Sequence, residues 1–161
     1  MAGLQDEQLK NPEQRDKKPL RIFYIEDQKD FRELIESELK RFTADVEIVG
    51  SFGSTEEAKD YLMKLRNENQ ELPDGIVSDN DLGNRKATGI EFARDLKKLR
   101  FEIPVVLFTG YAEQFKSFSQ EYLNKIGLKN IVDKNKPEAT ENLVGVLKSI
   151  KLLTSPSDKP Q

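Results

Sequence analysis

Short apolar segments alternate five times with longer stretches of helical periodicity between residues 20 and 153. The apolar segments are rich in Val, Ile and Phe, as β-strands are. They cover residues 20–25, 46–51, 75–78, 104–108 and 130–133. Three of the segments are nearly continuous apolar runs, which is typical of parallel strands covered on both faces. We predict that these three form the interior of a sheet.

Between the strand segments, apolar residues recur at the spacing of one helix face. The predicted stripes are Phe31, Leu34, Ile35, Leu39 and Phe42; Ala58, Leu62 and Leu65; Phe92, Leu96 and Leu99; Phe115, Phe118, Tyr122 and Ile126; and Leu143, Leu147 and Ile150. Ser54 and Glu57 match a capping box, and Pro137 suits the first turn of the last helix. Successive β/α units predict a doubly wound parallel sheet with helices on both faces, because the crossovers are right-handed.

Both ends of the chain are poor in apolar residues. Residues 1–19 contain few apolar side chains and residues 154–161 contain none, so neither end can bury enough surface to offset chain entropy. We therefore predict disordered tails over 1–19 and 154–161, with a single domain over 20–153. The first residues lack a basic region followed by an apolar stretch, so no secretory signal is predicted and a cytoplasmic location is expected.

Composition narrows the chemistry that is available. Lys and Arg number 26 against 29 Asp and Glu, and this net charge of −3 disfavours binding to nucleic acid or to an anionic membrane. The longest apolar run, residues 103–108, is far short of the roughly 20 residues that span a bilayer. The sequence contains no Cys and no His, which excludes disulfides and thiolate or imidazole ligands. Carboxylates, hydroxyls, amides and lysines remain.

Polar side chains follow four of the five predicted strands. In chain order they are Glu26, Asp27, Asp79, Asp81, Thr109 and Lys134. Ligands of doubly wound sheets bind beyond the carboxyl ends of the strands, where these side chains are expected to meet. Each residue alone is typical of a helix cap, a turn or a solvated surface. Their placement at the ends of the first, third, fourth and fifth strands favours one shared site.

The expected chemistry follows from the repulsion between these carboxylates. Two carboxylates about 5 Å apart repel by roughly 3 kcal/mol at an effective dielectric constant near 20, so a proton or a cation must relieve the repulsion. Oxygen ligands without His or Cys suit Mg²⁺, which also retains waters and binds phosphate oxygens. Thr109 and Lys134 supply a hydroxyl and an ammonium for the other oxygens of a phosphoryl group.

The combined pattern resembles the receiver domain of response regulators in two-component phosphorelay systems, over residues 20 to about 153. The acidic pair that closes the first strand of that family matches Glu26 and Asp27 in YIED, and its phosphoacceptor matches Asp79 in IVSDNDLG. Its hydroxyl residue matches Thr109 in VVLFTGY, and its lysine matches Lys134 in IVDKNKP. Its glycine at the start of the third helix corresponds to Gly89 in ATGIEF.

The resemblance implies a flavodoxin-like (βα)5 fold with strand order 2-1-3-4-5. It implies a signalling domain rather than an enzyme, in which Asp79 attacks a phosphohistidine of a histidine kinase or a histidine phosphotransfer protein. Lys134 would pair with one phosphoryl oxygen, and Thr109 would move to hydrogen-bond another.

The same resemblance implies a bound Mg²⁺. Asp27 and Asp79 would be direct ligands, Glu26 would act through a water, and Asp81 would offer its backbone carbonyl. Added charge on Asp79 would change the surface of strands 4 and 5, to which a downstream protein would bind. The tails hold no output domain, so no nucleic-acid or membrane partner is expected, and dimerisation on phosphorylation is left open.

Several positions depart from the family pattern. Ile131 stands where an aromatic switch residue is usual, and Asn135 replaces a common Pro. Gly83 also replaces a Pro, within a loop that is about two residues longer than the family spacing. Tyr111, two residues after Thr109, is placed to shield the acyl phosphate from water, and we therefore expect slow self-hydrolysis.

Two other functions compete with this interpretation. A small Mg²⁺-dependent phosphatase of the haloacid dehalogenase type also uses an Asp-x-Asp pair, a Thr and a Lys. That family carries the pair on its first strand, whereas Asp79 and Asp81 follow the third strand here. A degenerate receiver that binds partners without phosphorylation is the other alternative, which the departures at Ile131 and Asn135 leave open.

Overall fold

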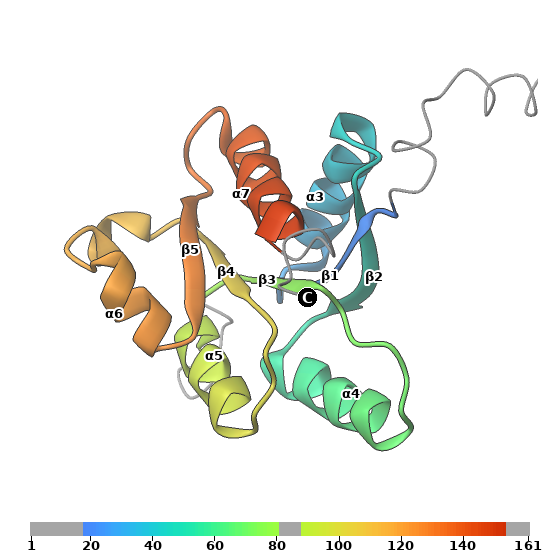
Figure 1. Cartoon of the computed structure of the whole chain (residues 1–161). Coiled ribbons are helices and arrows are strands. Elements are labelled where there is room, and N and C mark those ends of the chain that lie inside the picture. The colour runs from blue at the N-terminus through green and yellow to red at the C-terminus, as the bar shows by residue number, and fades with distance from the viewer. Residues whose placement is uncertain (1–17, 81–87, 154–161) are drawn as a thin grey trace, which may run out of the picture.

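The computed structural model of the chain describes residues 18–80 and 88–153 (Figure 1). One sheet of five parallel strands has the order β2-β1-β3-β4-β5. The strands are β1 (Leu20–Ile25), β2 (Val46–Phe52), β3 (Gly75–Ser78), β4 (Val105–Thr109) and β5 (Leu128–Asp133). The helices are α3 (Lys29–Phe42), α4 (Thr55–Asn67), α5 (Gly89–Lys98), the 3-10 helix η1 (Ala112–Phe115), α6 (Gln120–Lys125) and α7 (Ala139–Leu153). The predicted doubly wound, flavodoxin-like sheet is confirmed.

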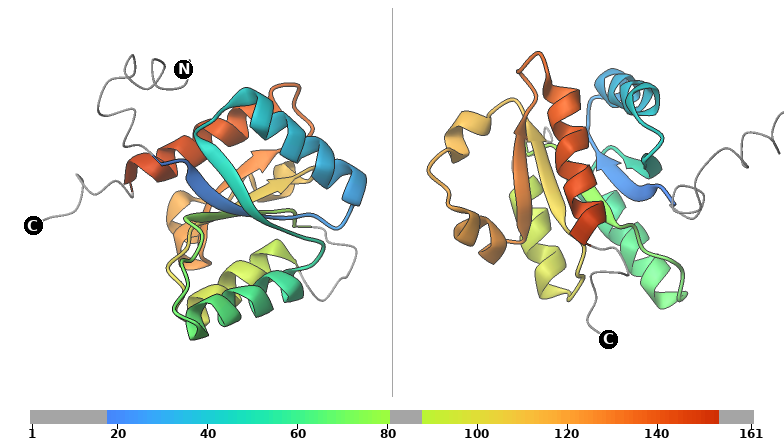
Figure 2. Two further views of the ribbon diagram at one scale, coloured as in Figure 1. Left: turned by 90° about the vertical axis from the view of Figure 1, so that its right-hand side faces the viewer. Right: turned by 45° about the horizontal axis from the view of Figure 1, so that its top comes forward.

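Helices cover both faces of the sheet, as Figures 1 and 2 show. The helices α3 and α7 pack on one face, where Tyr24, Val77 and Phe108 lie in a core with residues of both helices. The helices α4, α5 and α6 pack on the other face, against a second core around Phe23 and Leu107. Alternate residues of β1, β3 and β4 enter opposite cores, as the two-residue period of a strand requires.

The interior strands are β1, β3 and β4, and all residues of β3 and β4 are buried. The predicted bounds of β1 and β3 match the structure, and β5 begins two residues earlier than predicted, at Leu128. The strand β4 begins after Pro104, which has no amide hydrogen to donate to a ladder, and ends at Thr109. Thr109 is therefore the last residue of its strand, and Glu26, Asp79 and Lys134 directly follow theirs.

The structure confirms Ser54 as the cap of α4. The reciprocal contact of the predicted capping box, made by the Glu57 side chain, differs from the prediction. The Ser54 hydroxyl accepts a hydrogen bond from the Glu57 amide at 3.2 Å. The Glu57 carboxylate in turn accepts from the Gly53 amide at 3.3 Å, one residue before the position that a capping box predicts. The first contact satisfies an amide that the first turn of the helix leaves without a partner, and the second ties the residue before the cap to the same turn.

The prediction for Pro137 is wrong, because α7 begins two residues later, at Ala139. A turn in which the Ala139 amide donates to the Lys136 carbonyl at 3.1 Å precedes the helix and contains Pro137. The predicted stripe on this helix is confirmed, since Leu143, Leu147 and Ile150 are all buried.

The prediction of one continuous helix through Phe115, Phe118, Tyr122 and Ile126 is also wrong. Phe115 ends η1, and α6 is a separate helix that Ser119 caps by accepting from the Tyr122 amide. The ring of Phe118 contacts those of Phe115 and Tyr122 edge-on, with centroids 5.5 and 4.8 Å apart. The spacing of three and four residues therefore reflects ring packing across a break rather than one helical face.

The predicted stripe on α3 is wider than the buried face of that helix. Ile35 and Leu39 are buried, whereas 52% of Leu34 and 46% of Phe42 is exposed. The helix packs against α7 and β2 along one side only, so the flanks of its apolar stripe face solvent. The assignment of Leu34 and Phe42 to the core is corrected accordingly.

Two other expectations concern the whole chain. None of the helices in the described part of the chain is long and apolar enough to cross a membrane. Apart from residues 18 and 19, the predicted disordered tails lie outside the described residues, so their disorder stays a prediction.

Candidate functional site

Three carboxylates meet at the carboxyl edge of the sheet. Glu26 and Asp27 follow β1, Asp79 follows β3, and each offers an oxygen within 4.8 Å of the other two. The two strands are direct neighbours with Ile25 paired to Ser78, so the residues that follow them lie side by side. The Asp79 amide continues the ladder by donating to the Ile25 carbonyl at 3.0 Å.

The two members of the acidic pair have different surroundings. Only 1% of Glu26 is exposed, whereas Asp27 is exposed to solvent. Main-chain contacts hold Glu26 in place, because its amide donates to the Phe52 carbonyl at 3.0 Å and its carbonyl accepts from Arg32 Nη1 at 2.7 Å. Glu26 also continues the inward-facing alternation of Tyr24 on β1, which directs its carboxylate into the protein.

Lys134 supplies the positive charge of the site from the end of β5. Its Nζ donates to Asp79 Oδ2 at 3.0 Å and lies 3.4 Å from each carboxylate oxygen of Glu26. The Lys134 side chain is only 14% exposed. The Lys134 amide donates to the Thr109 carbonyl at 3.0 Å, which ties the start of its turn to the end of β4.

The electrostatics of this cluster favour a proton on Glu26. Burial raises the pKa of Glu26 to about 8, and its hydrogen bond with Asp79 acts in the same direction, while Lys134 opposes both effects. The repulsion between the buried carboxylates is therefore relieved by a proton and by the Lys134 ammonium together. A divalent cation bound by the same oxygens would have to displace that proton.

Thr109 lies at the end of β4 and is fully buried. Its Oγ1 accepts a hydrogen bond from the Tyr111 amide at 3.1 Å, so the hydroxyl hydrogen is left to donate elsewhere. Asp81 lies outside the described residues, and its predicted role as a backbone ligand stays a prediction. The same holds for Gly83 in the longer loop.

Gly89 allows α5 to approach the end of β3 closely. A Cβ at this position would lie 2.7 Å from the Asp79 carbonyl oxygen and 2.6 Å from Leu107 Cδ2. The next residue, Ile90, donates its amide to Asn80 Oδ1 at 3.2 Å. The glycine therefore positions the backbone of Asp79 rather than its carboxylate.

A pocket of about 360 Å³ opens above the carboxylates. Its walls are Glu26, Gln28, Phe31, Asp79, Gly110, Tyr111, Lys134 and Asn135. Sequence reasoning missed Gln28 and the role of Phe31, whose ring centroid lies 4.5 Å from Lys134 Nζ. The helical spacing of Phe31 assigned it to the core stripe, and no local signal distinguishes a ring that covers a distant lysine.

One of the departures from the family pattern, Asn135, lines this pocket. Asn135 donates from Nδ2 to the Gly110 carbonyl at 2.6 Å, which links the turns after β4 and β5. Ile131 is half-buried and packs against the second core. Tyr111 lies at the pocket wall with 56% of its surface exposed.

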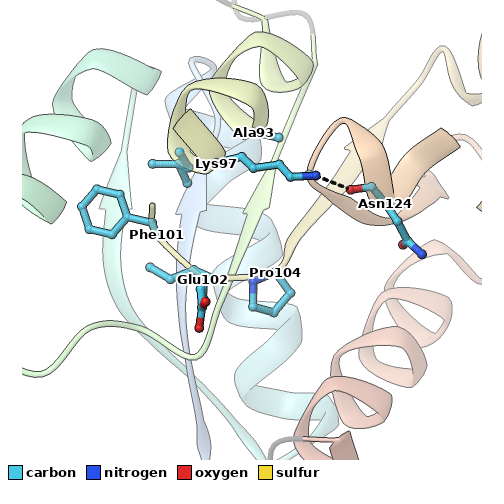
Figure 3. Close-up of a pocket in the computed structure, with 9 residues that line it drawn as sticks. Ala93, Lys97, Phe101, Glu102, Pro104 and Asn124 are labelled. Atoms are coloured by element: carbon cyan, nitrogen blue, oxygen red, sulfur yellow. Dashed lines mark hydrogen bonds between the residues drawn. The ribbon is translucent and has the colours of Figure 1, made fainter. Parts of the chain in front are cut away.

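A second hollow of about 260 Å³ lies before the start of β4, beside α5 and α6 (Figure 3). Its walls include Phe101, Glu102 and Pro104. The Lys97 ammonium at its rim donates to the carbonyls of Asn124 and Lys125 at 3.1 and 3.0 Å. Lys97 thus caps the end of α6, and the cluster of carboxylates belongs to the first pocket.

Residues 22–148 match the model of the response regulator receiver domain family. The chain belongs to this family. Receiver domains act in two-component signalling and bind Mg²⁺ at an acidic pocket. In this receiver domain, the carboxylates of Glu26, Asp27 and Asp79 form a group that could hold such an ion. The predicted resemblance is thereby confirmed.

Solved structures of receiver domains have the same fold. The response regulator domain of Thermotoga maritima CheB has a TM-score of 0.63 and 18% identity, over 84% of this chain and 96% of that chain. A LuxR-family two-component response regulator from Aurantimonas sp. SI85-9A1 has a TM-score of 0.63 and 22% identity, over 88% and 93%. The response regulatory domain of mrkE from Klebsiella pneumoniae has a TM-score of 0.60 and 15% identity, over 82% and 95%. No curated protein sequence matches this receiver domain significantly.

Proposed function

We propose that this receiver domain is a signalling switch that accepts a phosphoryl group on Asp79 from a histidine kinase or a histidine phosphotransfer protein. One observation carries the proposal. The Asp79 carboxylate lies at the base of an open pocket, 3.0 Å from the Lys134 ammonium and within a cluster of oxygens suited to a hard cation. A nucleophile, a cation for the phosphoryl oxygens and room for the donor are therefore present together.

In the proposed step, a carboxylate oxygen of Asp79 attacks the phosphorus of a phosphohistidine. The new P–O bond forms as the P–N bond breaks, and the electron pair of that bond stays on the imidazole nitrogen, which takes up a proton from water. Lys134 pairs with one phosphoryl oxygen. Thr109 donates its hydroxyl hydrogen to another oxygen while it still accepts from the Tyr111 amide.

We propose Mg²⁺ as the cofactor, with Asp27 and Asp79 as direct ligands and Glu26 acting through a water. The exposure of Asp27 and the burial of Glu26 support this division, since a hydrated ion reaches the exposed carboxylate first. Asp81 would add a backbone carbonyl. When bound, Mg²⁺ neutralises charge on the phosphoryl oxygens.

Phosphorylation would add charge and acceptor oxygens at the edge of the sheet. Thr109 and Lys134 would carry this change to β4, β5 and their helices, because each side chain is anchored at the end of one of these strands. We propose a downstream protein as the partner of that surface. Dimerisation of the phosphorylated form is an outcome that the same surface permits.

The proposal is tested by incubation with acetyl phosphate and Mg²⁺, followed by mass-spectrometric mapping of the label. We expect a stoichiometric label on Asp79 that is lost in Asp79→Asn. The matched control is Asp133→Asn, because Asp133 ends β5 and its carboxylate accepts from the Asn135 amide within its own turn. This variant should be labelled as the natural protein is.

Three results would contradict this proposed function. A label that persists in Asp79→Asn would place the chemistry on another residue. Continuous turnover of a generic phosphate ester would favour a phosphatase. An unlabelled protein that binds partners would favour a degenerate receiver.

A further inference from the structure

We propose that Phe31 is a positioning residue for phosphoryl transfer, because its ring holds the Lys134 ammonium beside Asp79. This inference rests on the function proposed above. The ring centroid lies 4.5 Å from Lys134 Nζ, well inside the range of about 6 Å for attraction between a cation and an aromatic face.

The Lys134 ammonium is enclosed by three groups. Oδ2 of Asp79 lies 3.0 Å away, the Glu26 oxygens lie 3.4 Å away, and the Phe31 ring closes a further side. A lysine side chain has a long flexible stem, so a free ammonium would occupy many positions. Enclosure removes this freedom before the phosphodonor arrives, and only 14% of the side chain remains exposed.

An aromatic ring suits this place better than a third carboxylate would. The ring attracts the cation through its quadrupole but carries no net charge, so it does not repel an incoming phosphoryl group. It also accepts no strong hydrogen bond, so it takes up none of the ammonium hydrogens that a phosphoryl oxygen could accept. The ring excludes water from the same side and thereby strengthens the remaining electrostatic contacts.

Phe31 is itself held independently of the lysine. It lies in the first turn of α3 and packs, half-buried, against the core beneath that helix. Lys134 follows the edge strand β5, whereas α3 follows β1, and β3 and β4 lie between these two strands. The contact therefore joins two elements that the fold places separately, and a role in packing alone has to be distinguished from a role in positioning.

The test measures the rate constant for phosphorylation by acetyl phosphate at fixed Mg²⁺. We expect Phe31→Leu, which keeps an apolar side chain but removes the ring, to lower the rate by about 3- to 30-fold. Phe31→Tyr should restore most of it. Phe42→Leu is the matched control, because Phe42 lies on the same helix, is 46% exposed and is remote from the pocket wall.

Fluorinated phenylalanines at position 31 separate positioning from packing. Each added fluorine withdraws electron density from the ring face but hardly changes its shape, so the rate should fall stepwise with fluorine number. This series decides the question even if Phe31→Leu fails to fold. A rate that stays flat across the series, with Asp79 still labelled, would overturn this inference alone. An unlabelled natural protein would instead overturn the proposed function, and this inference with it.

Discussion

The Lys134 ammonium lies 3.0 Å from Oδ2 of Asp79, although the two residues are 55 positions apart and follow strands that are not neighbours. The strand β4 lies between them, so the lysine side chain reaches across the end of β4 to meet the carboxylate. The Lys134 amide is tied to the Thr109 carbonyl at the same edge. The turn after β5 thus places a cation over the middle of the sheet.

Removal of that cation should destabilise the protein in a pH-dependent way. Lys134→Met keeps most of the stem but removes the ammonium that pairs with Glu26 and Asp79, and we expect the free energy of unfolding to fall by about 3 kcal/mol at pH 9. The loss should be smaller at pH 6, where Glu26 carries a proton. Chemical denaturation at both pH values measures the difference.

The control for this variant is Lys59→Met. Lys59 pairs with Asp95 at 3.2 Å, but both side chains are about a third or more exposed, so its loss should cost less than about 1 kcal/mol at either pH. Equal losses for Lys134→Met at pH 6 and pH 9 would contradict the assigned protonation of Glu26.

The pH dependence of stability should carry the signature of Glu26 itself. Burial and the hydrogen bond with Asp79 raise its pKa from 4.5 in the unfolded chain to about 8 in the folded protein. The folded state therefore binds the proton more tightly, and this contribution to stability is present at low pH and lost as the pH rises from about 4.5 to 8. Glu26→Gln should flatten the stability profile over that window, as denaturation at a series of pH values would show.

Addition of Mg²⁺ gives an independent check on the same group. Because a divalent cation beside Glu26 disfavours the proton on its carboxyl group, the affinity for Mg²⁺ should increase with pH up to about pH 8. Isothermal titration calorimetry in buffers of different ionisation enthalpy would detect the released proton. Binding that is independent of pH would show that Glu26 is already ionised.

Gly89→Ala should destabilise the protein by about 1 to 3 kcal/mol, because the new methyl group would lie too close to the Asp79 carbonyl and to Leu107. Gly145→Ala on α7 is the matched control, since nothing lies within 4 Å of the added Cβ. That change should instead stabilise the helix by about 0.5 to 1 kcal/mol. Thermal or chemical denaturation of both variants measures these changes in stability. If Gly89→Ala left the free energy of unfolding unchanged, the close approach of α5 would be contradicted.

Tyr111→Ala should shorten the lifetime of the phosphorylated form by about twofold or more. The exposed Tyr111 ring lies at the wall of the pocket and would limit the approach of water to an acyl phosphate on Asp79. The decay of label after removal of the phosphodonor measures this lifetime. Tyr122→Ala, which removes another exposed tyrosine on α6, should leave the decay unchanged. An unaltered half-life in Tyr111→Ala would refute the shielding role.

The sequence pattern was least informative where apolar spacing had more than one cause. Phe115, Phe118 and Tyr122 have helical spacing, yet Ser119 starts a new helix between them and their rings pack edge to edge. Leu34 and Phe42 continue the stripe of α3 but lie outside the strip that its neighbours cover. Periodicity reports which residues share a face, whereas burial depends on the width of the surface that meets that face.

The order of strands and helices, and the presence of carboxylates, a hydroxyl and a lysine after particular strands, could be predicted from the sequence, because strand and helix periods are local properties. Tertiary structure decided that Glu26 is buried with a raised pKa while its neighbour Asp27 is exposed, and that the Phe31 ring lies over the Lys134 ammonium. These properties arise from distances between separate elements. Desolvation and the attraction between charges depend on such distances, and no local pattern encodes them.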